Sequence, residues 1–141
     1  MAASASSPLT IAHPSDVASI GGLGGIAEKV SLLPGEFLFR EGDDAHALYV
    51  VKSGVVRVVS GSTVYETVRA GGIVGEMAIV DPGTSRSASV IAGTHAELIE
   101  IDLVTFLDMV SKTPDFALMV MRVMARRLRI MNQRYRPQSS W

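Results

Sequence analysis

Glu76 and Arg86, which stand ten residues apart, are the residues of this chain best suited to binding chemistry. The forked guanidinium of arginine fits a phosphate better than the point charge of a lysine does. An ionised glutamate only accepts hydrogen bonds, so Glu76 can receive them from a sugar hydroxyl. Together the two side chains suit an anionic ligand that carries hydroxyl groups.

The residues next to this pair are small or turn-forming. Gly75 allows a tight backbone turn at the end of a strand. A short helical turn over residues 76–80 would then present N–H groups at its N-terminus, where an anion is favoured. Ser87 and Ala88 let the chain approach a ligand closely, and Ser87 adds a hydroxyl donor. These features predict a binding loop rather than a catalytic centre.

The part of the chain that must position this loop reads as short strands. Residues 1–25 are rich in Ala, Ser and Gly and predict a loosely ordered lead-in, with one helical turn near residues 15–20. Many short β-branched runs with glycine-bearing turns then indicate an antiparallel sandwich or barrel. The runs are Phe37–Arg40, Leu48–Lys52, Val55–Ser60, Val64–Val68, Ser87–Ile91 and Leu98–Ile101.

Two helices are expected after Asp102. The first covers residues 103–112 and ends before Pro114, because the residue before a proline avoids helical geometry. The second covers residues 114–135, with Thr113 as its cap and Asp115 in its first turn. Residues 136–141 form a tail.

The long helix carries two apolar stripes. One has the 4-3-4-3-4 spacing of a coiled-coil seam, and the other runs beside it. One stripe is enough to cover a barrel, so the second favours pairing with the same helix of another copy. A single wide stripe buried within one chain is the alternative. The seam is Ala117, Met121, Met124, Leu128, Met131 and Tyr135, and the second line is Phe116, Val120, Val123 and Ile130.

The string Gly75-Glu76-Met77-Ala78, a short loop and Arg86-Ser87-Ala88 resembles the phosphate-binding cassette of the cyclic-nucleotide-binding domain family. That family includes catabolite activator regulators, kinase regulatory subunits and cyclic-nucleotide-gated channels. The residues from Pro34 to Asp43, the strand 48–54 and the start of the long helix agree with the family pattern. The resemblance covers residues 29–135.

The resemblance implies a mainly β fold, an eight-stranded antiparallel, jelly-roll-like β-roll over residues 29–102 with flanking helices, within a domain spanning residues 26–135. It implies a 3′,5′-cyclic nucleotide ligand, with cyclic AMP favoured over cyclic GMP, and no other cofactor. By the same resemblance Glu76 would bind the ribose 2′-hydroxyl and Arg86 the cyclic phosphate. The other cassette positions expected at the ligand are Gly75, Met77, Ala78, Ser87 and Ala88.

Contacts to the base are less well determined by the sequence. Val64, Val74 and Arg127 are candidates, as are Met77, Ile79, Arg126 and Asn132. Core packing explains the apolar members of this set equally well, and an exposed helical position is the commoner case for the polar ones. Away from the cassette, a lone glutamate or arginine on a barrel would be read as a solvated charge.

Composition excludes several classes of protein. The chain has 141 residues, no cysteine, 48% hydrophobic and 19% charged residues, which predicts one folded domain without disulfides. No run is long enough to span a bilayer, and the N-terminus lacks the features of a signal peptide, so we expect a cytoplasmic protein. The three histidines lack metal-site spacing, and no nucleophile–base pair stands out, so neither a metal site nor an enzyme is expected.

Charge is divided unevenly along the chain. Residues 1–111 carry 6 Lys/Arg against 13 Asp/Glu, and residues 112–141 carry 7 against 1. The basic end could neutralise nucleic-acid phosphates, but a solvated helix face is favoured because no second reading element follows.

The preferred hypothesis is a stand-alone sensor or regulatory module that signals by repositioning its C-terminal helix. The signal would pass to a protein effector that the sequence does not identify. The alternatives are a dimerisation module with a vestigial pocket, or a DNA-associated regulator without its own helix-turn-helix. Neither the choice between the two nucleotides nor whether the chain is a complete protein follows from the sequence.

Overall fold

The computed structural model describes residues 27–135, and the strands in this range form two four-stranded antiparallel sheets. The first sheet has the order β1-β8-β3-β6 and the second the order β2-β7-β4-β5. The strands are β1 (Glu28–Leu32), β2 (Phe37–Phe39), β3 (Ala47–Ser53), β4 (Val55–Ser60), β5 (Thr63–Arg69), β6 (Ile73–Val74), β7 (Ser89–Ala92) and β8 (Ala96–Asp102). They confirm the eight-stranded roll.

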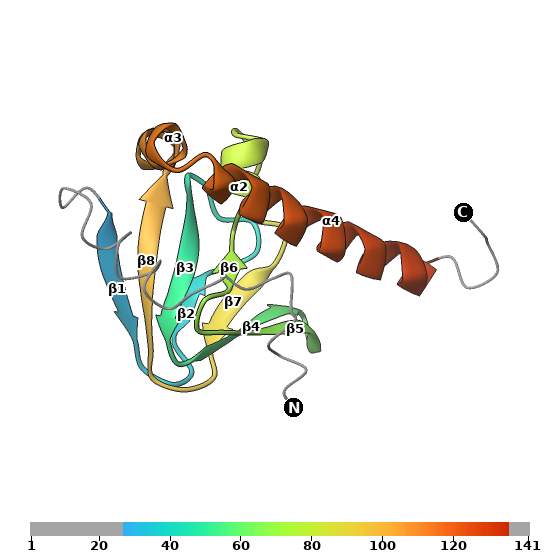
Figure 1. Ribbon diagram of the computed structural model, residues 1–141. Helices are drawn as coiled ribbons and strands as arrows, with labels where there is room; N and C mark the ends of the chain where they lie inside the picture. The colour runs from blue at the N-terminus through green and yellow to red at the C-terminus, as the bar shows by residue number, and fades with distance from the viewer. Residues whose placement is uncertain (1–26, 136–141) are drawn as a thin grey trace, which may run out of the picture.

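Within residues 27–135, three helices accompany the roll. They are α2 (Met77–Val80), α3 (Leu103–Lys112) and α4 (Asp115–Tyr135). Figure 1 shows α2 and α3 at one end of the roll, and α4 passing from that end across the molecule and beyond it. The short and the long C-terminal helix lie where the sequence predicts them, with the first residue of the long helix at Asp115.

Strand β3 is the centre of the core because it is buried on both faces. Alternate side chains of a strand point to opposite faces of its sheet. Leu48 and Val50 pack in one cluster with Met109 of α3 and Phe116 of α4. Ala47, Tyr49 and Val51 pack in a second cluster with side chains from both sheets, including Val56, Val68, Val90 and Leu98. The helices therefore cover one face of the first sheet, and the second sheet covers the other.

Two strands of the structure, β1 and β6, were not predicted from the sequence. Strand β1 is largely exposed and contains a lysine and a serine, so it lacks the apolar run of a buried strand. Strand β6 has only two residues, which is too short for any periodicity to show. The predicted lead-in over residues 1–25, its helical turn and the tail over residues 136–141 lie outside the described residues.

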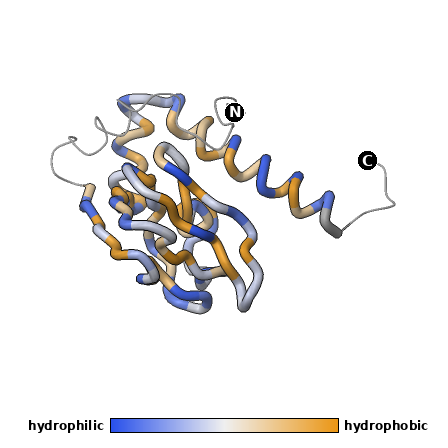
Figure 2. The backbone as a smooth tube through the Cα atoms, turned by 90° about the horizontal axis from the view of Figure 1, so that it is seen from below, coloured by the Kyte–Doolittle hydropathy of each residue, from blue (hydrophilic) through white to orange (hydrophobic). Residues whose placement is uncertain are grey.

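The two stripes of α4 have different surroundings. Phe116, Val120 and Val123 are buried against the first sheet. Met121, Leu128 and Met131 are more than half exposed. Figure 2 shows hydrophobic and hydrophilic residues alternating along α4 where it extends past the roll. One stripe is thus used within the chain, and the predicted dimer contact through the other stays a prediction.

Helix α3 begins at a side-chain cap. The carboxylate of Asp102 accepts a hydrogen bond of 2.9 Å from the backbone N–H of Thr105. That bond lowers the pKa of Asp102, because it stabilises the charged form. We expect Asp102→Ala to lower the free energy of unfolding by about 1 kcal/mol at neutral pH, as measured by urea denaturation.

The matched control is Asp102→Asn, which keeps a capping oxygen and should lose less stability. Since the folded state depresses the pKa of Asp102, the stabilisation is present above the ordinary aspartate pKa and disappears as the pH falls through the folded value. A difference between Asp102→Ala and the unaltered protein that stays constant down to acidic pH would contradict a charged cap.

Candidate functional site

A cavity of about 1060 Å³ lies between the second sheet, the segment around residues 74–88 and one side of α4. Its wall combines apolar side chains with few charged ones, which is typical of small-molecule sites. The charged members come from three separate places: Glu66 on β5, Glu76 and Arg86 in the loop segment, and Arg126 and Arg127 on α4. Apolar members include Phe39, Val58, Val74, Met77, Ala88, Val90, Met121, Met124, Leu128, Ile130 and Met131.

Gly75 turns the chain between β6 and α2 and so brings Glu76 to the cavity. Its φ is +77°, a left-handed conformation that residues with a side chain rarely adopt. Glu76 follows as the N-cap residue of α2, and its carbonyl accepts the backbone N–H of Ile79 at 3.0 Å. Ile79 and Ala78 are buried beneath this turn. The predicted helical turn is therefore present, and it fixes the Glu76 backbone at the rim.

The backbone at Arg86 is anchored to a loop before β3. Its N–H donates to the carbonyl of Asp43 at 2.8 Å, and its carbonyl accepts the N–H of Gly42 at 2.9 Å. The guanidinium also donates to backbone carbonyls, through Nη2 to Ala47 at 2.9 Å and through Nη1 to Gly75 at 3.3 Å. Main chain and side chain are thus both fixed before any ligand arrives.

The guanidinium of Arg86 is a buried positive charge. Only 6% of the residue is exposed, and burial lowers its pKa. Within residues 27–135 no carboxylate forms a salt bridge with Arg86, and its Nε is buried without a hydrogen-bond partner. Arginine remains protonated in proteins, so the site holds a cation that Asp43, Glu100 and Glu76 influence only from beyond salt-bridge distance. Such a group is costly unless an anion pairs with it.

Glu76 is held by Arg127 of α4. One carboxylate oxygen of Glu76 accepts a hydrogen bond from Nη1 of Arg127. The same guanidinium binds Glu66 of β5 through Nε at 2.8 Å and Nη2 at 3.3 Å, and it donates to the carbonyl of Ile73 at 2.6 Å. Burial alone would lower the pKa of Arg127, but Glu76 and Glu66 raise it. One arginine therefore ties α4 to both carboxylates.

Most of the predicted site residues line the cavity together. These are Val74, Gly75, Glu76, Met77, Arg86, Ser87, Ala88 and Arg127. Ala78 is buried under α2 and does not belong to the lining. Val64 is 51% exposed on β5 and is also outside the lining, and Ile79 packs in the core. Arg127, named as a contact to the base, lies on Glu76 instead of on an exposed helix face.

Among the residues that sequence reasoning did not assign to the site, three contact or lie near its arginines. Glu66 lies on an edge strand and reads as an exposed strand residue until its contact with Arg127 is seen. Phe39 and Tyr49 read as ordinary strand aromatics, yet both rings lie near the guanidinium of Arg86. No local sequence signal distinguishes these three, because each acts through a residue far along the chain.

Gly75→Ala should weaken anion binding at this site. A Cβ there would lie 2.7 Å from Nη1 of Arg86 and 3.3 Å from the carbonyl oxygen of Ala47. Arg86 would have to move, and the left-handed backbone would be strained by about 1–2 kcal/mol. We expect lower thermal stability and at least tenfold weaker ligand binding in calorimetry.

Gly35→Ala provides the matched control. Gly35 has φ +87°, but a Cβ there meets nothing within 4 Å. It should share the loss of stability and keep ligand affinity. Equal binding by both variants would contradict the steric role of Gly75.

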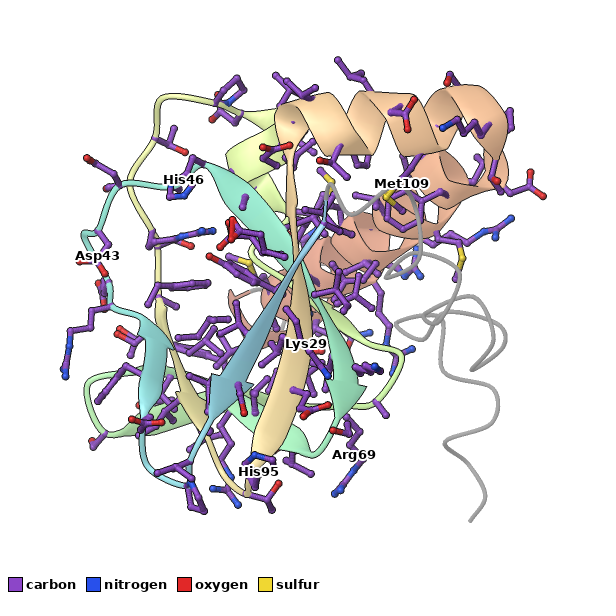
Figure 3. The ribbon with its side chains drawn as sticks, turned by 90° about the vertical axis from the view of Figure 1, so that its left-hand side faces the viewer. Lys29, Asp43, His46, Arg69, His95 and Met109 are labelled. Atoms are coloured by element: carbon purple, nitrogen blue, oxygen red, sulfur yellow. The ribbon has the colours of Figure 1, made fainter. Side chains whose placement is uncertain are left out.

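The described residues contain no group of three or more histidine, cysteine, aspartate or glutamate side chains placed to hold a metal. Figure 3 shows His46 in the loop before β3 and His95 at the far end of the roll, so these two histidines do not converge. His13 lies outside the described range. None of the helices between residues 27 and 135 is both long and apolar enough to cross a membrane.

Comparisons with known proteins show which family this chain resembles. Residues 29–113 match the family described as the cyclic nucleotide-binding domain. The chain is 33% identical over 95 residues to cyclic nucleotide-gated channel beta-3 of Canis lupus familiaris, which covers 64% of this chain and 12% of the channel. It is 28% identical over 102 residues to the cAMP-activated global transcriptional regulator CRP of Salmonella typhimurium, covering 69% of this chain and 49% of the regulator.

A solved structure shares the fold. The catabolite activator protein of Thermus thermophilus superposes with a TM-score of 0.74 at 29% identity, covering 92% of this chain and 62% of that one. The chain spans about half the length of the CRP relative and a much smaller part of the channel. The sequence match, the β-roll and the shared architecture lead to one conclusion: the chain belongs to the cyclic nucleotide-binding domain family.

Proposed function

We propose that this chain binds a 3′,5′-cyclic nucleotide in the cavity beside α4, with cyclic AMP favoured over cyclic GMP, and acts as a regulatory module. The cyclic phosphate would pair with Arg86, and the ribose 2′-hydroxyl would donate to Glu76. The names of two relatives support the nucleotide class: one is a cyclic nucleotide-gated channel, and the other is a cAMP-activated regulator. The proposed role is binding and not catalysis.

The observation that carries the proposal is the state of Arg86. It is a buried cation at the cavity wall. Two backbone carbonyls hold it, and no carboxylate in the described part of the chain forms a salt bridge with it. A cyclic phosphate bears one negative charge and would neutralise this cation. A ligand without an anionic group would leave it unpaired, so the site favours the cyclic nucleotide over its nucleoside.

Arg127 supports a coupling between the ligand and the position of α4. A ribose hydroxyl that reaches Glu76 joins a carboxylate already bound to α4. A ligand changes a conformational equilibrium only by its different affinity for the two states. Here that difference would arise at Glu76, where ligand and helix share one acceptor group. We propose that α4 is the element that moves on binding and conveys occupancy to a protein effector.

Titration calorimetry with cyclic AMP and cyclic GMP tests the binding proposal. We expect saturable binding of both, with cyclic AMP tighter, and no measurable binding of adenosine at the same concentrations. Absence of binding by either cyclic nucleotide at millimolar concentration would refute it. Hydrogen exchange of α4 with and without saturating cyclic AMP then tests the coupling, and unchanged protection would contradict it.

A homodimer through α4 is the second part of the proposal. Met121, Leu128 and Met131 are exposed, and with the half-buried Met124 they have the 3-4-3 spacing of a helix-pairing seam. Pairing with the same stripe of a second copy would cover these side chains and close the open side of the cavity, which they help to line. Analytical ultracentrifugation should show a dimer that Leu128→Glu converts to a monomer. A monomeric unaltered protein at high concentration would exclude this arrangement.

A further inference from the structure

We infer that Phe39 is a positioning residue for the phosphate-binding arginine, an inference that rests on the proposed function. The Cζ of Arg86 lies 3.9 Å from the centroid of the Phe39 ring. The ring of Tyr49 lies at 5.8 Å from the same Cζ, and the two rings are 6.1 Å apart at 40°. Arg86 thus lies over an aromatic ring that itself lines the cavity.

An aromatic face fits the requirement of this site. Arg86 must stay charged in a buried place until an anion arrives, and a carboxylate partner there would compete with the phosphate. A ring face attracts the cation through its quadrupole, most strongly where water is excluded, and it uses none of the N–H donors. Phe39 can therefore stabilise the guanidinium of Arg86, whose N–H groups remain free to donate to the carbonyls of Ala47 and Gly75 and to the ligand.

The position of Phe39 follows from an irregularity in β2. Phe37 pairs with Ile91 of β7 and Phe39 with Val90, so two residues advance on β2 for one on β7. Such a bulge changes the direction of a side chain relative to its neighbours. Phe37 and Phe39 accordingly serve different arginines, Phe37 lying against Arg40 at 3.8 Å and Phe39 against Arg86.

Gly75 packs closely against both Phe39 and Arg86. A Cβ on Gly75 would lie 3.4 Å from Cε2 of Phe39 as well as 2.7 Å from Nη1 of Arg86. Glycine, ring and guanidinium are therefore in mutual contact. Removing the ring leaves space into which the guanidinium can tilt, and its donors would no longer be directed toward one phosphate position.

Calorimetric binding of cyclic AMP to Phe39 variants provides the test. We expect Phe39→Leu to weaken binding about tenfold, in line with the loss of a desolvated cation–π contact. Phe39→Tyr keeps the ring face and should stay within about threefold of the unaltered protein. Phe37→Leu is the matched control: it removes a cation–π contact of nearly the same distance on the same strand but outside the cavity lining, and affinity should not change.

A double-mutant cycle separates positioning from simple packing. In the Arg86→Lys background, which lacks the planar group, Phe39→Leu should change affinity less than twofold. A tenfold loss in that background as well, or no loss from Phe39→Leu in the unaltered background, would overturn the inference while the proposed function stands. Thermal unfolding of each variant identifies any that fail to fold. If Phe39→Leu fails to fold, the affinity of Phe39→Tyr is the test, and a loss greater than about threefold contradicts the inference. Absence of binding by the unaltered protein would overturn the proposed function together with this role.

Discussion

Arg86→Ala should abolish cyclic-nucleotide binding or weaken it by about 2 kcal/mol or more, which is about 30-fold. The substitution removes the buried cation that two backbone carbonyls and the Phe39 ring hold at the cavity wall, and with it the proposed partner of the phosphate. Affinity measured by calorimetry with cyclic AMP checks this result. Arg86→Lys should give an intermediate loss, because a lysine keeps the charge but not the fork.

Arg69→Ala is the control for this prediction. Arg69 is an exposed arginine at the end of β5 and is not part of the cavity lining, so its removal changes net charge by the same amount without touching the site. Its side chain is labelled in Figure 3. Affinity should stay within about twofold. Equal losses from Arg69→Ala and Arg86→Ala would show that only the overall electrostatic field matters.

Arg127→Met should release the C-terminal half of α4 from the roll. Among the side chains of α4 that the structure describes, Val123 is the last buried one, and those after it are half-buried or exposed. Arg127 therefore supplies the main polar tie in this part, with hydrogen bonds to Glu66, Glu76 and Ile73. Hydrogen bonds to charged groups contribute roughly 1.5–3 kcal/mol. The side chains of Arg127 and Glu66 are each 19% exposed, so solvent screens their interaction. We therefore expect a loss of stability near the lower end of that range.

Hydrogen exchange is the direct measurement of this effect. A loss of about 1.5 kcal/mol corresponds to local opening about tenfold more frequent for backbone amides after Val123, while the sheets keep their protection. Arg129→Met, at an exposed position on the same helix, should leave exchange unchanged. If both variants exchanged like the unaltered protein, apolar packing alone would hold the helix and the proposed coupling through Glu76 would be untenable.

Glu66 and Glu76 differ in what they do for this tie. Both carboxylates bind Arg127, but Glu76 also stands where the ribose hydroxyl is proposed to bind. Glu66 also lines the cavity, but the proposal assigns it no ligand contact. Under the proposed function, α4 would stay attached to Glu66 when Glu76 receives the ligand, and the helix would shift without being lost from the roll.

Much of the fold could be predicted from the sequence because its signals are local. Glycine-bearing turns separate the strands, Pro114 separates the two helices, and Asp102 caps the first of them. The strands that were not named, β1 and β6, lack such signals: one is polar and exposed, and the other has two residues. Periodicity also distinguished two stripes on α4, but not which of them would be buried.

The same division holds for the site. Glu76 and Arg86 were predicted from residue type and from the small residues around them, and the structure brings both to one cavity. The sequence by itself therefore determined which loop brings Glu76 and Arg86 to the cavity and which family its pattern resembles. Those properties depend on a segment of about fifteen residues, and residues so near in sequence also lie near one another in the folded chain.

Only the tertiary structure decided what surrounds that pair. Arg127 reaches Glu76 across 51 residues and Glu66 across 61, and Phe39 of β2 contacts Arg86 in the loop segment before β7. These contacts depend on how two sheets and a helix pack, and packing places together residues that no local pattern relates. Glu76 and Arg86 consequently differ in the folded chain: the carboxylate is already bound to α4, whereas the guanidinium lies on an aromatic ring and forms no salt bridge with a carboxylate of the described residues.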